Sequence, residues 1–389
     1  MQEAFTIQSR NIALLTKNSM INFLFHPITT YIIPGMLLGF ALCFFFQKVP
    51  YREKLGEYIL ARRIMGCNYI VYFIALIAQT VTKQGSSAPT LERFIILTIS
   101  STQAFFFTYS LTTLISPKET GARKTCREII MIVVVAAAAF TSLEVSRDNT
   151  HEMVFRIFSA FYVLQIVRYV YFFRRNYTAY HRNADNFFSD NERLRLHWTI
   201  TAFYSATALG VLALIYAWTV LPVVSLVFMT MAGVFYAVFA IHFLNYVYAF
   251  PIIEPVINEP PVSPAEENAD RVEAEPTDAD RLLMESIDRL MEKEKLYKSP
   301  ELSIENLSVL TGKSHRLVSG AINHCRQENF KTYINKYRVR EAKRLIESGW
   351  LDQHTMESLA KEVGFGNRTN LYRVFKRYTG MSPSDRHDH

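Results

Sequence analysis

The sequence has few of the residues that disulfide-linked and metal-binding proteins need. It carries four cysteines in 389 residues, and none belongs to a C-x-x-C pair or to a Cys/His spacing typical of zinc sites. Cys43 and Cys67 fall inside apolar runs, whereas Cys126 and Cys325 stand alone. This distribution argues against a disulfide framework and against a metal site, so the four residues are expected to be ordinary buried or solvated thiols.

Catalytic motifs are also missing. Seven long apolar runs contain no lysine, which argues against a retinal protein, because its chromophore needs a Schiff-base lysine in a membrane span. The H-E-x-x-H motif of metalloproteases is absent, and no kinase, receiver or other catalytic motif is present. We therefore expect a protein that is not an enzyme and that uses no cofactor.

The first 253 residues consist largely of apolar segments. Their bounds are residues 28–46, 64–81, 94–115, 129–145, 157–173, 198–218 and 223–250. Most approach the roughly 20 residues that an α-helix needs to cross about 30 Å of hydrocarbon. Soluble core helices are shorter and have a polar face, which these runs largely lack. The sequence predicts seven membrane-spanning helices within residues 1–253, with no cleavable signal peptide before the first.

The distribution of positive charge supports this count. Three segments between the runs, residues 47–63, 116–128 and 174–197, hold fourteen Lys and Arg residues, and the alternate segments hold six. Because cytoplasmic loops carry the excess of positive charge, the three basic segments are assigned to the cytoplasm. Seven spans then place the N-terminus outside and the C-terminal domain in the cytoplasm, on the inner face of the cytoplasmic (inner) membrane. The fifth run has the weakest pattern, since Arg168 lies within it, but the alternation fails without it.

A few strongly polar residues interrupt the runs. Ionisable groups within a membrane span are functional candidates by default. Arg168 lies near the cytoplasmic end of its run, where its guanidinium can reach the interface. His242 and Asn245 are three residues apart and therefore share one face of the seventh span. Hydrogen bonding between helices is the simpler interpretation for these two, and all three residues are candidates for sensing a signal.

The segment 254–280 differs in composition from both of its neighbours. It carries nine acidic residues, one basic residue and five prolines. Such a segment cannot bury enough apolar surface to fold, which predicts a flexible linker. Within residues 281–300, apolar positions recur at helical spacing over residues 281–297. This pattern predicts an amphipathic helix that packs on the following domain or pairs with a second copy of the chain.

Residues 301–389 carry fifteen basic and ten acidic residues and contain one helical pattern twice. In the first unit, Ser303 is expected to cap one helix and Ser314 the next, with a turn at Gly312 between them. The leucines expected to face the interior of this unit are Leu307, Leu310 and Leu317.

The second unit follows the same plan. Thr355 is expected to cap its first helix and Gly364 to end it, and Asn367 and Gly380 to delimit the next. Residues 329–348 form a single long helix between the units. Two helices joined by a tight turn make a helix-turn-helix motif. The sequence thus predicts an all-α chain, with a seven-helix transmembrane bundle followed by a cytoplasmic double helix-turn-helix domain.

Three segments carry a resemblance to a known family. They are "YINKYRVREAKRLIES" in the long helix, "LAKEVGF" after it and "LYRVFKRYTGMSP" near the end. Because of the order and spacing of these three segments, residues from about 300 to 385 resemble the DNA-binding domain of the AraC/XylS family of bacterial transcription regulators. This region is under a quarter of the chain. The resemblance implies that the second helix of each unit enters its own major groove, about one turn apart.

The resemblance also implies which residues read DNA. Arg pairs bidentately with guanine and Asn prefers adenine. In the first reading helix these residues are His315, Arg316, Ser319 and Asn323. In the second they are Arg368, Thr369, Asn370 and Arg373, with Lys376 and Arg377 suited to phosphates. Gly320 offers no side chain where the family usually has a reader, so the first helix is expected to read fewer bases.

Together these features predict a membrane-embedded, sequence-specific transcription regulator that senses its signal and binds promoter DNA with one chain. Its expected partners are double-stranded DNA, RNA polymerase, the lipid bilayer, a small ligand and a second copy of the chain through residues 281–297. Two alternatives stay open: a transporter or membrane enzyme with an autoregulatory DNA-binding tail, and a scaffold whose tail binds protein. The spans show no inverted repeat and little polar lining, which argues against transport, and the basic reading helices argue against a scaffold.

Overall fold

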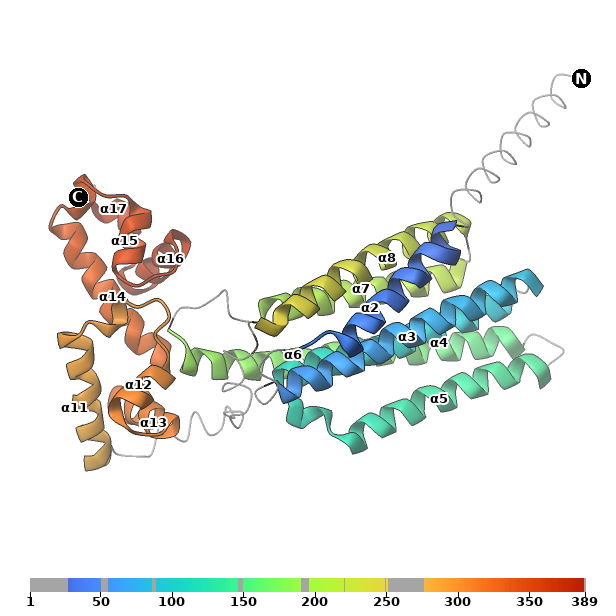
Figure 1. Ribbon diagram of the computed structural model, residues 1–389, viewed down its shortest axis with the longest axis horizontal. Helices are drawn as coiled ribbons and strands as arrows, with labels where there is room; N and C mark the ends of the chain where they lie inside the picture. The colour runs from blue at the N-terminus through green and yellow to red at the C-terminus, as the bar shows by residue number, and fades with distance from the viewer. Residues whose placement is uncertain are drawn as a thin grey trace, which may run out of the picture. The chain divides into compact units, whose positions relative to one another are not determined.

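The computed structural model describes residues 27–49, 55–85, 89–145, 150–189, 196–219, 221–248, 250 and 276–387. These parts of the chain are helical, apart from connecting turns and one isolated antiparallel bridge between Phe188 and Ser303 (Figure 1). They belong to two units, residues 1–177 with 196–254 and residues 178–195 with 255–389. The predicted all-α class is confirmed.

The first unit is a bundle of apolar helices (Figure 1). Its elements are η1 (Ile28–Ile32), α2 (Ile33–Phe46), α3 (Gly56–Gly85), α4 (Pro89–Ile115), η3 (Pro117–Thr120), α5 (Ala122–Val145), most of α6 (Thr150–Phe187), α7 (His197–Thr219), α8 (Pro222–Asn245) and η5 (Tyr246–Tyr248). Six helices in the described residues, α3 to α8, are long and apolar enough to cross a membrane. The first predicted span is shorter, because its residues form the five-residue π-helical turn η1 and the 14-residue α2.

The helix α6 is longer than its apolar run predicts. The run ends at residue 173 and a basic loop is expected after it, yet α6 continues to Phe187. Its 38 residues make a helix of about 57 Å, almost twice the hydrocarbon thickness of a bilayer. Residues 174–187 are too polar to register as a span, but they contain no glycine or proline that would end a helix. The residues of α6 after Tyr177 group with the second unit.

Aromatic side chains fill the interior of the bundle. Phe94, Tyr162 and Tyr216 are buried in one cluster that joins α4, α6 and α7. The hydroxyl group of Tyr162 donates a hydrogen bond to the backbone oxygen of Gly210 at 3.1 Å. A Cβ atom added to Gly210 would lie 2.7 Å from that hydroxyl oxygen. Glycine therefore permits the close approach of α6 and α7 at this level.

The outer surface of the bundle is apolar as well. Exposed aliphatic side chains occur on every long helix from α3 to α8 except α4, among them Ile74, Ile130, Val134, Leu164, Val167, Val211, Val234 and Val238. Soluble monomers rarely expose apolar patches of this extent. A lipid-facing bundle requires such a surface.

The second unit contains the C-terminal helices. They are α11 (Asp278–Lys293), η6 (Leu296–Lys298), α12 (Ile304–Thr311), α13 (His315–Arg326), α14 (Phe330–Glu347), η7 (Trp350–Asp352), α15 (Met356–Glu362), α16 (Arg368–Thr379) and α17 (Pro383–His387). The amphipathic helix predicted over residues 281–297 corresponds to α11 and η6. The linker predicted over residues 254–280 lies outside the described residues except for its last five, and of these Asp278–Asp280 already form the first turn of α11, so the helix begins three residues earlier than predicted.

Most of these helices begin and end where the sequence predicts. The side chains of Ser303, Thr355 and Asn367 accept hydrogen bonds from backbone N–H groups three residues ahead. Ser314 occupies the N-cap position of α13 but makes no side-chain hydrogen bond there, so its predicted capping role is wrong. Gly364 ends α15 with a φ of +92°, a left-handed conformation that favours glycine.

The predicted interior of the first helix-turn-helix unit needs a correction. Leu307 is buried, but Leu310 is 54% exposed and Leu317 is 53% exposed. Both line a groove between α11, α12 and α13, together with Leu282 and Leu290. Helical spacing identifies the apolar face of a helix, but it does not say which neighbour covers that face.

Candidate nucleic-acid interface

The helix α16 has one buried and one exposed face. Leu371, Val374 and Phe375 are packed in the core that α14, α15 and α16 share. Residues on the opposite face are exposed, and these are Arg368, Thr369, Arg373, Lys376 and Arg377. Four of these five side chains are basic. This face can therefore meet phosphates along its length and base edges near its N-terminus.

Asn370 differs from the other predicted readers because it is buried. Only 4% of its surface is exposed. Its backbone N–H donates to Oδ1 of the capping Asn367 at 2.8 Å, and its own Oδ1 accepts from Nη2 of Arg373 at 2.6 Å. In this position Asn370 orients the Arg373 guanidinium rather than reaching outward itself.

Arg368 is also held in place at the start of α16. Its guanidinium carbon lies 5.0 Å from the ring centroid of Tyr372, and Nη2 donates to the Tyr372 hydroxyl oxygen at 3.3 Å. Its backbone N–H donates to Oε2 of Glu357 at 3.3 Å, which ties α16 to α15. The contact with Tyr372 combines a cation–π interaction with a hydrogen bond and restricts the side chain.

The helix α13 buries Val318, Ala321 and Ile322. On its other side Arg316 is exposed, and Ser319 and Asn323 are partly exposed. The predicted reading residues of α13 therefore share a face that the interior of the domain does not cover.

His315, the first residue of α13, contacts a residue from outside the helix-turn-helix units. Its ring lies edge-to-face with the ring of Phe187, with centroids 5.8 Å apart and planes at 72°. Phe187 is the last residue of α6, in the part of α6 that groups with the second unit. We call residues 178–189 the α6 end segment. The sequence does not predict the position of this segment, because residues 174–197 are expected to form a loop.

Three further contacts attach the α6 end segment to the C-terminal helices. The backbone N–H and the hydroxyl group of Ser189 both donate to the backbone oxygen of Leu302, at 3.2 and 2.7 Å. Nζ of Lys331 lies 3.0 Å from Oδ1 of Asp185. The isolated bridge pairs Phe188 with Ser303, the capping residue of α12.

Arg338 of α14 forms the buried centre of this region. It is fully buried, and its Nε donates to the backbone oxygen of Tyr297 at 2.7 Å. Its Nη2 donates to the backbone oxygen of Ser299 and to Oγ of Ser189, both at 2.8 Å. A buried charge must be hydrogen-bonded to be tolerated. Arg338 thus joins α14, the turn after η6 and the α6 end segment.

Two ion pairs lie in and beside α14, one within the helix itself and one between η6 and α15. Arg344 donates to both carboxylate oxygens of Glu341, at 2.9 and 3.0 Å, and this lowers the pKa of Glu341. Glu362 lies 2.6 Å from Nζ of Lys298 and raises the pKa of that lysine. The Glu341 contribution to stability is lost as pH falls through its depressed pKa. The Lys298 contribution is lost as pH rises through its elevated pKa, so both are present at neutral pH.

Residues 307–387 match the family model described as "Helix-turn-helix domain". This part of the chain is an AraC-type helix-turn-helix domain. The chain is accordingly a DNA-binding transcription regulator. Among solved structures it is similar to "The C-terminal domain of AraT, a response regulator from Geobacillus stearothermophilus", with 19% sequence identity and a TM-score of 0.25, over 30% of this chain and 88% of that chain. No curated protein matches the chain.

The matched residues begin in α12 and end at the last residue of α17. They include both helix-turn-helix units and α14 between them. The helix α11, η6 and the α6 end segment lie outside the match, although their side chains contact the AraC-type domain.

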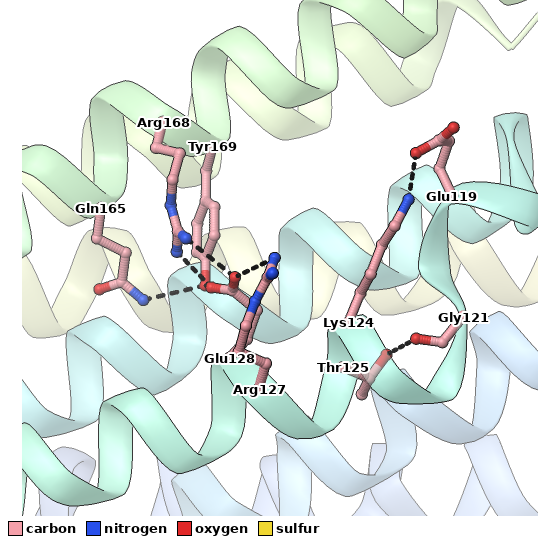
Figure 2. A network of polar contacts seen from close by, with 9 residues as sticks. All are labelled: Glu119, Gly121, Lys124, Thr125, Arg127, Glu128, Gln165, Arg168 and Tyr169. Carbon is pink, nitrogen blue, oxygen red and sulfur yellow. Dashed lines mark hydrogen bonds and ion pairs between the residues drawn. The ribbon is translucent and has the colours of Figure 1, made fainter.

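Of the candidate sensing residues in the bundle, Arg168 is paired. Its guanidinium donates to both carboxylate oxygens of the buried Glu128 on α5, through Nη1 at 2.9 Å and through Nη2. The hydroxyl group of Tyr169 donates to the same carboxylate at 3.1 Å, and Nε2 of Gln165 donates to that hydroxyl oxygen at 3.2 Å (Figure 2). Gln165 also bonds to Ser101 of α4, so three helices share this network. An arginine within an apolar run implies that it has a partner. No sequence pattern near Arg168 indicates that this partner is Glu128, 40 residues earlier in the chain.

The other two candidates lie on the surface of the bundle. His242 and Asn245 lie on one face of α8, as their spacing predicts, and that face is exposed rather than buried between helices. The imidazole of His242 packs 5.2 Å from the ring of Trp198 on α7, measured between centroids. This ring contact joins α7 and α8 and gives His242 a packing role.

Proposed function

We propose that the chain is a membrane-embedded, one-component transcription regulator. In this proposal the bundle lies in the cytoplasmic membrane and the AraC-type domain lies on its cytoplasmic side. A signal received by the bundle controls promoter binding and, through it, RNA polymerase. One observation carries the proposal. The same chain contains a bundle with an apolar exterior and the helix α16, which has an exposed basic face.

DNA reading is proposed to occur through α13 and α16 in two successive major grooves. Arg368 and Arg373 are assigned to base edges, because each is oriented by a neighbour at the N-terminal end of α16. Lys376 and Arg377 are one turn further along and are assigned to phosphates. Asn370 is assigned to positioning Arg373, which replaces the direct adenine contact that the sequence alone implies.

Pairing of two chains through residues 281–297 is proposed as the way in which two reading domains reach one promoter. The exposed Leu282 of α11 and the exposed Leu310 and Leu317 support this, because a second copy would remove them from water. Two domains held together bind one DNA site at high effective concentration, which raises affinity without a new DNA contact.

The proposal is tested with the full chain reconstituted in lipid nanodiscs and incubated with a pool of random duplexes. We expect one sequence motif to be enriched, with affinity that falls steeply as salt rises, because phosphate contacts release counterions. Arg373→Ala should weaken binding by about 1–3 kcal/mol and relax specificity at one position, whereas Lys376→Ala should weaken all sequences alike and flatten the salt dependence. Enrichment no greater than that obtained with empty nanodiscs would show the proposal to be wrong.

A further inference from the structure

The bundle contains a partly open cavity of about 80 Å³ between α3, α4, α6, α7 and α8. A cavity needs about 10–15 Å³ to hold one water molecule, so this one has room for a small organic molecule. Aromatic rings make up much of its lining, including Tyr72, Phe107, Phe203 and Phe235. No acidic or basic side chain lines it. A charged molecule would lose its hydration here without gaining a counter-charge, so the cavity suits a neutral guest.

The side-chain amide of Gln103 lines this cavity, and only one of its two polar atoms has a hydrogen-bond partner among the residues that the structure describes. The hydroxyl group of Tyr236 donates to Oε1 of Gln103, which orients the amide. Nε2 of Gln103 is buried and has no hydrogen-bond partner among the described residues. The hydroxyl groups of Thr108 and Thr207, in contrast, are satisfied by backbone oxygens of their own helices, at 2.7 and 2.9 Å. A buried N–H group without an acceptor is costly, and a bound acceptor would remove that cost.

We propose that this cavity binds a small, neutral, ring-containing compound with a carbonyl oxygen. The carbonyl oxygen accepts a hydrogen bond from Nε2 of Gln103, and the ring packs among the aromatic side chains around it. The compound enters from the lipid phase, in which such molecules dissolve. The role of this compound as the signal rests on the proposed function. Its binding in the cavity does not depend on that function.

The test uses the full chain in nanodiscs and radiolabelled acetophenone, a one-ring ketone that attaches to nearby C–H bonds under near-ultraviolet light. We expect saturable labelling of peptides from α4 and α8 that excess unlabelled acetophenone prevents. Ala232→Phe fills the cavity and should abolish saturable labelling, whereas Val234→Phe, on the exposed side of the same helix, should not. Gln103→Leu should weaken binding about 3- to 10-fold, the effect of one lost hydrogen bond.

Labelling that does not saturate, or that Ala232→Phe leaves unchanged, would overturn the cavity proposal. DNA binding by the same nanodiscs is measured separately. Failure of the chain to select any duplex would contradict the proposed function, but it would leave a saturable acetophenone site standing.

A second inference comes from the α6 end segment and does not depend on the cavity. Phe187 packs against His315, which is the N-terminal residue of α13, and residues at that end of a reading helix contact base edges. Asp185, two residues earlier, holds the Lys331 ammonium group, which becomes unavailable to phosphate. Ser189 is fixed by Leu302 and Arg338. The segment therefore occupies one end of the first reading helix and neutralises a basic group nearby.

The geometry points to competition between the α6 end segment and DNA for the N-terminal end of α13. With the segment bound, only α16 is free to enter a major groove. Release of the segment gives the domain its second reading helix. The regulator in this structure is thus in a weakly binding state with respect to DNA.

A reversible cross-link tests this competition in the full chain. The four native cysteines are replaced by serine, and Phe188→Cys is combined with Ser303→Cys, the pair that forms the antiparallel bridge. Residues opposite each other in such a bridge are close enough for a disulfide. We expect the oxidised protein to bind its duplex at least tenfold more weakly than the same protein after reduction. Equal affinities before and after reduction would overturn the inference.

Single substitutions provide the opposite change. Phe187→Ala and Asp185→Ala should each raise DNA affinity about 3- to 10-fold, because they weaken the bound segment. Tyr171→Ala, on an exposed position of the same helix, serves as the control and should have no effect. Lower or unchanged affinity in both variants would contradict the proposed competition.

Discussion

Asn370 and Arg373 act as one unit on α16. The backbone N–H of Asn370 donates to the capping Asn367, and the buried side-chain oxygen Oδ1 of Asn370 accepts a hydrogen bond from Nη2 of Arg373. A guanidinium fixed before binding loses less conformational entropy when it pairs with a base. In the proposed mode of DNA reading, the specificity of α16 therefore depends on the buried side-chain amide of Asn370, which does not itself reach DNA.

A double-mutant cycle tests this dependence. We expect Asn370→Ala to weaken specific DNA binding by about 1 kcal/mol, because the Arg373 side chain becomes free to rotate. In an Arg373→Ala background, Asn370→Ala should have little further effect on affinity. Binding of the selected duplex by the four proteins gives the coupling energy. Equal effects of Asn370→Ala in both backgrounds would show that Asn370 contacts DNA directly or acts on stability alone.

Single residues also show where sequence reasoning ends in this protein. The basic residues of α16 could be placed on one exposed face, because helical spacing and the family pattern together determine it. Asn370 could not be assigned to the interior, because it lies between that face and the buried one. The partner of Arg168 could not be identified either, since Glu128 precedes an apolar run 40 residues earlier and reads as part of a basic loop.

At the scale of elements, the turn between α15 and α16 depends on one glycine. Gly364 has a φ of +92°, and a Cβ added to it would lie 2.3 Å from the backbone oxygen of Tyr297. Gly364→Ala should therefore destabilise the AraC-type domain by at least about 1–3 kcal/mol. Gly366, two residues later, has open space around it, so Gly366→Ala should cost much less. Urea unfolding followed at the C-terminal domain compares the two variants, and equal midpoints would contradict the argument.

The helices themselves were predictable to different degrees. Caps and glycine turns placed α12, α15 and α16 well, because these signals are local. The polar end of α6 was missed, because hydropathy detects only the part of a helix that matches a bilayer, and nothing in residues 174–187 marks a stop. Leu310 and Leu317 were expected to face the interior of their unit, but each is about half exposed.

Those exposed leucines give a prediction about pairing. If two chains associate through α11 and the groove beside it, Leu282→Glu combined with Leu317→Glu should convert a dimer to a monomer, since both positions would become buried charges. Sedimentation of the full chain in detergent measures the change. Val309→Glu is the control, because Val309 is exposed but does not line the groove. A monomeric wild-type protein at micromolar concentration would contradict pairing through this surface.

At the scale of the whole molecule, α6 is the element that both inferences share. Tyr162, Ile166 and Tyr169 of α6 line the bundle cavity, and Tyr169 also bonds to Glu128. The last ten residues of the same helix belong to the second unit and include Phe187. On the two inferences above, we expect a guest that changes the packing of α6 in the bundle to act on the same helix whose end contacts α13. A continuous helix transmits displacement better than the flexible linker that the sequence predicts for residues 254–280.

The last prediction concerns the side of the membrane on which each end of the chain lies. This prediction depends on η1 and α2. Taken separately α2 is short, but η1 precedes it without a break, and their 5 and 14 residues make a helix of about 28 Å. That length nearly matches the hydrocarbon core, so we expect this segment to cross the membrane as the first of seven spans. The N-terminus should then lie outside and the C-terminus in the cytoplasm.

Reporters active only outside should work when fused before residue 27 or after residue 148, and reporters active only in the cytoplasm should work after residue 195 or 389. If only six helices cross, the fusion before residue 27 alone changes sides, so a cytoplasmic signal there, with the other three unchanged, would show that η1 and α2 do not span the membrane.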